Sequence, residues 1–398
     1  MRPEDAIPSM LRSKQIIVVG DDKQLPPTEF FVGGGSDSDY DEEEEIPSES
    51  ILELASSTFR TSRMLKWHYR SRHHSLIQYS NKEFYNKQLV VFNSPNDTSR
   101  DLGIHFHACP GLYINRSNET EMLHTADLAV RLMQEFPKKS IGIATMNATQ
   151  RELLFDHMEG LRETSEEVAG YMQYWEEKLE YFFVKNLENI QGDERDIIII
   201  STVYGPSPGK SKPSQNFGPI NRANGHRRLN VLFTRAKESV HVVSSLRPNH
   251  IEVGPNSSRG VRVFREYLEY AMNGLIAESN HSKFNIPDSD FEKSVGNVIE
   301  RFGYEVSYQV GSSGYFIDIA VKSKNSHGCF FLAIECDGAP FHSTKSARDR
   351  DRLRQEQLEN LGWRFYRIWS TDWYRSRLTE EDKLLLAIQE AEDNFTSK

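Results

Sequence analysis

Cysteine is scarce in this sequence of 398 residues, and the three present, Cys109, Cys329 and Cys336, are widely separated. Such spacing provides neither a disulfide framework nor the paired cysteines of a zinc site. Long apolar runs are also absent, because none approaches the roughly 18 residues that a membrane-spanning helix requires. Residues 1–5 lack the apolar core of a secretory signal. Together these absences favour a cytoplasmic protein with no membrane partner.

An excess of basic residues is lacking as well, since 48 Lys and Arg face 58 Asp and Glu, for a net charge of −10. That balance alone would disfavour a nucleic-acid partner. Part of the negative charge is local, however, because a run of acidic residues lies between positions 37 and 45. Such a run is typical of a solvated loop. The total charge therefore does not exclude nucleic acid, for which local basic clusters matter more.

Strand and helix patterns alternate along the first 250 residues and predict an α/β fold with a parallel sheet. Short apolar, β-branched runs predict buried strands at residues 15–20, 140–145, 196–203 and 240–244. Helices are expected at residues 50–57, from about 148, and over most of 152–185. Asp21 and Asp22 follow the first of these strands, where open α/β sheets place their ligands.

A second unit is expected after a linker at residues 254–260 and a helix at 261–272. It should begin near residue 286 with a helix at 291–302. The predicted elements that follow are strands at 306–310, 315–321 and 330–335, a helix at 347–361 and a strand at 363–368.

Two segments resemble motifs III and IV of superfamily 1 helicases, in the branch that includes the nonsense-mediated-decay helicase. They are residues 19–27 (VGDDKQLPP) and residues 67–72 (WHYRSR). The resemblance implies that Asp21 and Gln24 lie beside the terminal phosphate of ATP. It also implies that Arg70 reaches the phosphates from the second RecA-like lobe.

Motifs V and VI of the same family are matched by residues 189–196 (NIQGDERD) and 228–237 (RLNVLFTRAK). The resemblance implies a close backbone approach at Gly192 and a ribose hydroxyl bound by Glu194. It makes Arg235 the arginine finger, a fixed guanidinium that meets the charge developing on the transferred phosphoryl group. ATP is then the implied cofactor.

A P-loop and the motif II carboxylate, both needed for ATP hydrolysis, are missing ahead of residue 19. Residues 205–211 (GPSPGKS) resemble a P-loop only superficially, because one residue is missing between the glycines and no helix pattern follows. The expectation is a chain truncated after motif II, with an incomplete ATPase site. Its partner would be an upstream helicase segment that carries the P-loop.

Residues 291–373 resemble the PD-(D/E)XK nucleases, specifically the very-short-patch-repair-like type appended to large bacterial helicases, and imply a restriction-endonuclease-like fold. The matching acids are Glu292, Asp318, Glu335 and Asp337. Residues two apart in a strand point the same way, so Glu335 and Asp337 share a face. With Asp318 they would hold Mg²⁺ or Mn²⁺, which prefer oxygen ligands and could activate water against a phosphodiester.

The match departs from the nuclease pattern at Asp337, which stands where the family has a lysine. His342 is a candidate for orienting the attacking water, and it is equally a surface histidine bonded to backbone. Arginines between residues 348 and 354 either neutralise the aspartates among them or, at Arg350 or Arg354, touch DNA phosphates. Trp363, Trp369 and Trp373 could stack on bases, although such residues more often pack in a core.

Two functions fit these observations. The first is the distal part of an ATP-dependent DNA helicase coupled to a metal-dependent endonuclease, in repair, restriction or defence. The second is a nucleic-acid-binding fragment without catalysis, in which the helicase lobe is a scaffold. The expected division is a remnant of the first RecA-like lobe (1–58), the second lobe (59–250), a linker helix (251–286) and the nuclease domain (287–398).

Overall fold

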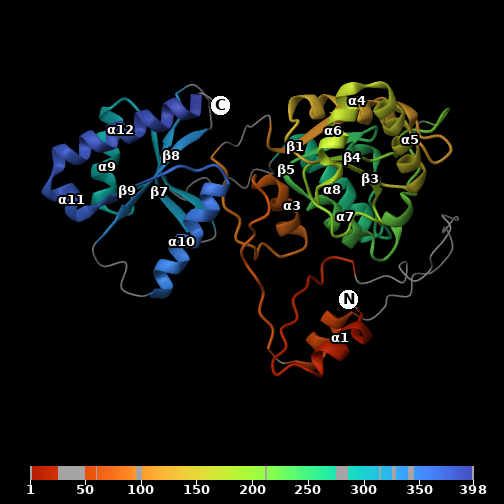
Figure 1. Cartoon of the computed structure of the whole chain (residues 1–398), viewed down its shortest axis with the longest axis horizontal. Coiled ribbons are helices and arrows are strands. Elements are labelled where there is room, and N and C mark those ends of the chain that lie inside the picture. The colour runs from red at the N-terminus through yellow and green to blue at the C-terminus, as the bar shows by residue number, and fades with distance from the viewer. Residues whose placement is uncertain are drawn as a thin grey trace.

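The computed structural model describes residues 2–25, 50–59, 61–95, 101–210, 213–274, 286–312, 315–324, 329–338 and 345–396. Within them the chain forms two sheets with separate sets of helices (Figure 1). This arrangement confirms the predicted α/β class with a parallel helicase-type sheet followed by a separate sheet domain. The acidic run at 37–45 and His342 lie outside the described residues. Among the described helices, none combines the length and the apolar character needed to cross a membrane.

The first sheet is entirely parallel, with strand order β1-β5-β4-β2-β3. Its strands are β1 (Gly103–Ala108), β2 (Ile141–Thr145), β3 (Phe183–Asn186), β4 (Arg195–Ser201) and β5 (Ala236–Ser244). The four isoleucines of β4, residues 197–200, are all buried because helices cover both faces. The predicted strands at 140–145, 196–203 and 240–244 are confirmed.

Helices cover this sheet on two sides. α3 (Ser75–Glu83), α7 (Gly225–Phe233) and α8 (Arg259–Asn273) contribute to one core, and α4 (Glu119–Glu135), α5 (Ala148–Thr164) and α6 (Glu166–Glu176) to the other. Several helices begin at a polar residue whose side chain accepts the N–H of the third helical residue, as Asn118 and Ser258 do. Since Phe264 and Leu268 of α8 are buried in the first core, the expected linker helix is part of this lobe.

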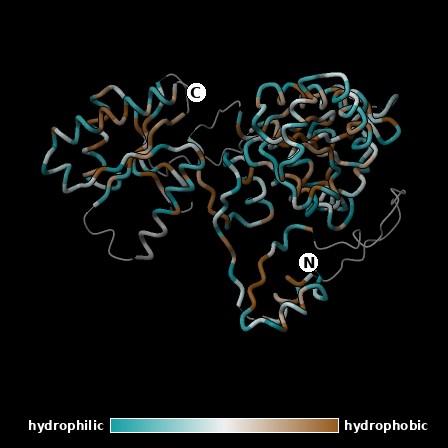
Figure 2. The backbone as a smooth tube through the Cα atoms, viewed as in Figure 1, coloured by the Kyte–Doolittle hydropathy of each residue, from teal (hydrophilic) through white to brown (hydrophobic). Residues whose placement is uncertain are grey.

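The prediction of a buried strand at residues 15–20 is wrong. This segment lies between α1 (Pro3–Met10) and α2 (Ile51–Thr58) without regular structure, and Ile17 and Val19 are 78% and 74% exposed. Figure 2 shows a hydrophobic stretch in this N-terminal part, away from both sheets. An extended apolar run becomes a buried strand only where neighbouring strands take its hydrogen bonds. Among the described strands, none pairs with it.

The second sheet contains β6 (Val306–Ser312), β7 (Tyr315–Lys322), β8 (Phe330–Asp337) and β9 (Phe365–Trp369), in that order. The first three are antiparallel neighbours, and β9 joins β8 in parallel after α10 (Lys345–Asn360). α9 (Asp290–Arg301) and α12 (Arg377–Thr396) pack on one face. The predicted elements are all found, whereas the short α11 (Ser370–Arg375) and α12 were not predicted.

A smaller apolar cluster joins the two parts. Val90 and Phe92, from the segment after motif IV, pack with Ala320, Leu358 and Trp363. Two hydrogen bonds reinforce the contact: the Phe330 N–H donates to the Pro95 carbonyl (2.8 Å), and Trp363 Nε1 donates to the Asn93 carbonyl (2.7 Å). The α10 side of the second sheet therefore packs partly against residues 90–95 of the lobe that carries motifs IV to VI.

Candidate functional site

The motif III segment is held in place by hydrogen bonds centred on Asp21. The Asp21 carboxylate accepts from Gln24 Nε2 (2.8 Å), the Lys23 N–H (2.9 Å) and the Tyr85 hydroxyl (2.6 Å). On α7, Asn230 Nδ2 donates to the same hydroxyl and to the Lys23 carbonyl, both at 3.1 Å. Asp21 and Gln24 are thus brought together, and motif III is docked on the helix that carries motif VI.

Motifs IV, V and VI meet at Glu194. Arg70 Nε lies 2.9 Å from the Glu194 carboxylate, and Lys237 Nζ lies 3.2 Å from its other oxygen. Arg70 also donates to the Thr234 carbonyl (3.2 Å), and Lys237 pairs with Glu180 as well. Arg70 and Lys237 are therefore already paired with carboxylates.

Arg235 is buried beside this group. Its Nε donates to the Val231 carbonyl (2.7 Å) and Nη2 to the Thr234 hydroxyl (3.2 Å). Burial, and after it the positive charge of the neighbouring Arg70, lower the pKa of Arg235 to about 10. The Arg235 guanidinium thus lies near Arg70 but is held by hydrogen bonds to Val231 and Thr234 of α7 and its C-terminal end.

Gly192 has a φ of +94°, a backbone conformation that residues with a Cβ rarely adopt. A Cβ at this position would meet no atom within 4 Å. The backbone conformation of motif V, rather than crowding within the chain, accounts for the glycine.

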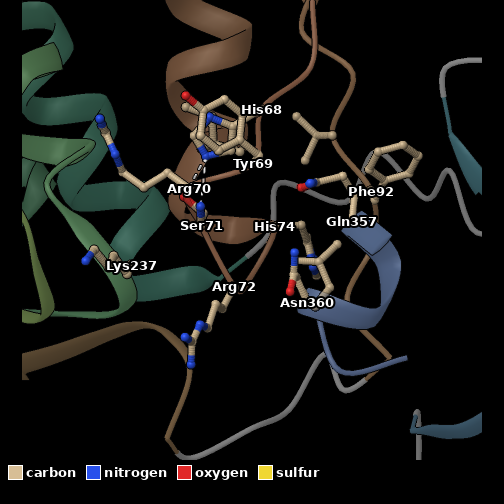
Figure 3. A pocket seen from close by; sticks show the side chains of 13 residues that line it. His68, Tyr69, Arg70, Ser71, Arg72, His74, Phe92, Lys237, Gln357 and Asn360 are labelled. Carbon is tan, nitrogen blue, oxygen red and sulfur yellow. Dashed lines mark hydrogen bonds between the residues drawn. The ribbon is translucent and has the colours of Figure 1, made fainter. Parts of the chain in front are cut away.

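A cavity of about 230 Å³ lies between motif IV and the nuclease-type unit. Figure 3 shows Arg70 and Lys237 on the helicase side and Gln357 and Asn360 of α10 on the opposite side. Burial and the nearby Arg70 lower the pKa of His68, which also lines the cavity, to about 4, so this ring is neutral near pH 7. This contact between motif IV and α10 could not be predicted from the sequence, because the two are far apart along the chain.

Three of the predicted nuclease acids, Asp318, Glu335 and Asp337, share one face of the second sheet, whereas Glu292 lies on α9. Ile319 of β7 lies opposite Ile334 of β8, and one step further along this register Asp318 lies opposite Glu335. Ala333 packs with Leu358 of α10, whereas Ile334 packs in the core on the α9 side. Because side chains alternate along a strand, Glu335 and Asp337 project on the α10 side with Ala333.

The environment of these acids is crowded and largely buried. Burial raises the pKa of Glu335, Arg354 lowers it, and the nearby Asp318 carboxylate raises it. Burial also raises the pKa of Asp318, which accepts a hydrogen bond from the Cys336 N–H (2.8 Å).

Arginines neutralise two of the acids. Arg354 of α10 lies 3.1 Å from Glu335, and Arg367 of β9 lies 2.6 Å from Asp337. Across the described ranges, no three His, Cys, Asp or Glu side chains are grouped closely enough to hold a metal ion. The donors are nevertheless hard oxygens on one sheet face, a set whose chemistry suits Mg²⁺ or Mn²⁺.

Glu292 lies at the start of α9 and is 6% exposed. Its carboxylate accepts from the Asp288 N–H (2.8 Å), the Ser289 hydroxyl (3.0 Å) and Gln309 Nε2 (2.9 Å). It contributes to the field at Asp318, whose pKa it raises. In this structure Glu292 is thus held by hydrogen bonds at the N-terminus of the helix.

Other residues singled out from the sequence have structural positions. Trp363 and Trp373 are buried, and Trp373 Nε1 donates to the Ser294 hydroxyl (3.2 Å), whereas Trp369 is 44% exposed. The arginine partners of the acids escaped sequence reasoning in part. Arg354 was one of several arginines in a mixed-charge helix, and Arg367 belongs to a strand whose pairing with β8 only the fold reveals.

Comparison with known proteins gives two family matches. The family described as AAA domain matches residues 48–247, and the family described as REase_MTES_1575 matches residues 291–388. An uncharacterized ATP-dependent helicase of Mycoplasma genitalium is 29% identical, over 93% of this chain and 34% of that protein. Regulator of nonsense transcripts 1 of Dictyostelium discoideum is 26% identical, over 59% of this chain and 17% of that protein.

Among solved structures, the C-terminal domain of a possible DNA helicase from Lactobacillus plantarum covers 47% of this chain and 94% of that chain, at 16% identity and a TM-score of 0.28. The mycoplasma protein and its Mycoplasma pneumoniae homolog extend well beyond the match, since this chain spans about a third of their length. The similarity to helicases of the nonsense-mediated-decay branch and to a nuclease-type family is thus confirmed.

Proposed function

The chain belongs to the AAA domain family, and its curated relatives are ATP-dependent helicases. From this membership we propose that the chain is part of an ATP-dependent DNA helicase with a metal-dependent nuclease. We propose that it acts in DNA repair, restriction or defence. We further propose the division into residues 1–58, 59–250, 251–286 and 287–398, of which the third packs on the parallel-sheet lobe through α8 and the last is the nuclease domain.

The ATP-facing half of the proposal rests on two groups of residues. Asp21 and Gln24 of motif III are docked on α7, and Arg70, Glu194 and Arg235 of motifs IV to VI lie together beside the parallel sheet. These residues would meet the terminal phosphate and the ribose of ATP, and Gly192 would let the motif V backbone turn beside them. The 398 residues contain no P-loop to cradle the phosphates. We therefore infer that this chain alone hydrolyses ATP negligibly and depends on a segment that carries the P-loop.

The nuclease half rests on one observation: Asp318 and Glu335 lie opposite each other on neighbouring strands, with Asp337 on the same face. Asp318, Glu335 and Asp337 would hold Mg²⁺ or Mn²⁺, and a bound ion would polarise the phosphodiester and lower the pKa of a bound water. Hydrolysis joins the water oxygen to phosphorus, breaks one phosphorus–oxygen ester bond, and leaves the protons on the new phosphate and the released hydroxyl. Glu292 would add negative potential beside Asp318, and His342 would orient the water.

A second candidate function is favoured by the arginine partners of the acids. With Arg354 on Glu335 and Arg367 on Asp337, two of the site's carboxylates are neutralised without a metal. A chain that keeps this state would hold nucleic acid without cutting it, with the helicase lobe as a scaffold.

Incubation of the chain with supercoiled plasmid and Mn²⁺ separates the two functions. The wild-type chain should nick the plasmid, whereas Asp318→Asn should not. Asp372→Asn, which changes an exposed aspartate of α11 in the same unit, is the matched control and should nick normally. Equal nicking by the wild type and Asp318→Asn would remove the nuclease proposal, and binding without nicking by either would support the second candidate.

A further inference from the structure

The nuclease-type site lacks a lysine at the position where its family carries one, because Asp337 stands there. β8, which carries Glu335 and Asp337, has no lysine or arginine of its own to offer to a substrate. Asp337 pairs with Arg367 of β9 at 2.6 Å. A phosphodiester carries a negative charge, and further charge develops on it as water attacks. The face that holds Asp318 and Glu335 would repel such a group unless a cation is supplied from elsewhere.

Arg354 is the basic side chain best placed to supply it. Its Nη2 donates to Glu335 (3.1 Å) and to the Phe316 carbonyl in the preceding strand, and the side chain is 18% exposed. Nε is buried without a hydrogen-bond partner, and no bond from Nη1 is found to the described residues. Among the described residues, only one of the three guanidinium nitrogens thus has a hydrogen-bond partner, although the group has donors to spare.

The same helix links this position to the cavity beside motif IV. Gln357, one turn beyond Arg354, lines that cavity together with Asn360. Positions three apart on a helix are neighbours on its surface. The cavity-lining Gln357 and Arg354 are therefore neighbours on the surface of α10, so one ligand lying along this helix could reach both the cavity and the carboxylates.

We propose that Arg354 is the phosphate-binding cation of this nuclease site. It holds Glu335 while no metal is bound, and it turns its guanidinium to the scissile phosphate once a metal takes the carboxylate. This inference rests on the proposed nuclease function and adds to it the residue that replaces the family's lysine. A guanidinium suits the task because its planar fork matches two phosphate oxygens.

Three variants test the proposal: Arg354→Gln, Arg354→Lys and, as the matched control, Arg352→Gln. Arg352 lies on the same helix, but its side chain is 81% exposed and pairs with Glu356. The readouts are Mn²⁺ affinity by calorimetry, binding of a duplex oligonucleotide in EDTA by fluorescence anisotropy, plasmid nicking, and thermal unfolding.

Arg354→Gln should bind Mn²⁺ more tightly, because the charge that competes for Glu335 is gone. It should bind the duplex more weakly and nick about 10²-fold more slowly, the loss typical of a removed transition-state donor. Arg354→Lys should recover part of the nicking, since it keeps the charge but not the fork. Arg352→Gln should match the wild type in every readout.

A purely structural arginine gives another pattern, with weaker Mn²⁺ binding, weaker duplex binding and a lower unfolding temperature together, and that pattern overturns the proposal. Wild-type nicking by Arg354→Gln, beside an inactive Asp318→Asn, overturns it while leaving the nuclease function intact. If the wild type itself does not nick, the proposed nuclease function fails. The role of Arg354 then also falls unless Mn²⁺ and duplex affinity still change in opposite directions.

Discussion

Replacing Tyr85 with phenylalanine should release the motif III segment from the lobe that carries motifs IV to VI. The Tyr85 hydroxyl donates to the Asp21 carboxylate at 2.6 Å and accepts from Asn230 of α7 at 3.1 Å. Burial and the bond to Asp21 raise the pKa of Tyr85, so the hydroxyl remains protonated and able to donate. The phenylalanine ring keeps the packing and removes only this group.

The magnitude follows from the type of hydrogen bond that is lost. A bond to a charged partner contributes about 1.5–3 kcal/mol, and about 1.4 kcal/mol corresponds to a tenfold change in an equilibrium constant. The local opening constant of residues 2–25 should therefore rise about 10- to 150-fold. Unfolding of the lobe should change little, because its two large cores are untouched.

Hydrogen exchange at the Lys23 and Gln24 amides measures this opening. Both amides are bonded to Asp21, at 2.9 Å to the carboxylate and 3.3 Å to the carbonyl. The matched control is Tyr171→Phe, which removes a hydroxyl bonded to the Lys139 carbonyl on the other side of the sheet. Unchanged exchange at the two amides in Tyr85→Phe would refute the reasoning, as would an equal change in the control.

Two further predictions concern the stability of the lobe built on the parallel sheet. Burial lowers the pKa of His241 to about 2 and of His107 to about 4. The unfolded chain therefore binds more protons below the ordinary value of about 6.5, and stability should fall as the pH drops from 6.5 towards 4. Urea denaturation across this pH range measures whether the free energy of unfolding falls. In His241→Asn the free energy of unfolding should fall less steeply with decreasing pH than in the wild type, and an identical slope would count against this prediction. Glu121, which is fully buried and accepts from the Val203 N–H (2.6 Å) and the Ser245 hydroxyl (2.8 Å), should not tolerate glutamine. Glu121→Gln should lower the free energy of unfolding by about 3 kcal/mol, because its amide NH2 would face hydrogen-bond donors. The control Glu119→Gln, at an exposed position, should unfold like the wild type in thermal denaturation. Equal stability of the two variants would contradict this prediction.

Strand and helix positions with many buried neighbours could be predicted from the sequence. The isoleucines at 197–200 and the alternation around Asp318 fix buried strands because period and composition agree. Residues 15–20 have the same composition and yet Ile17 is exposed, since composition cannot tell whether a partner strand is present. The helices after residue 370 were missed because α12 carries a weakly periodic pattern.

The candidate sites were predictable only as far as single motifs reach. Asp318, Glu335 and Asp337 could be named from the resemblance to the nuclease family, and the common face of Glu335 and Asp337 follows from strand periodicity. Their partners Arg354 and Arg367 come from other elements, and only the packing of α10 and the pairing of β9 bring them close. Tyr85 escaped in the same way, because nothing near it in the sequence marks it as a partner of Asp21.

The cluster of Val90, Phe92, Leu358 and Trp363 has a mechanical consequence. Apolar contacts of this kind resist sliding because separating them exposes their surface to water. In the proposed helicase–nuclease, the nuclease-type unit would therefore keep a fixed position relative to the lobe that carries motifs IV to VI. The distance between a strand bound by that lobe and the proposed cutting site would then be constant.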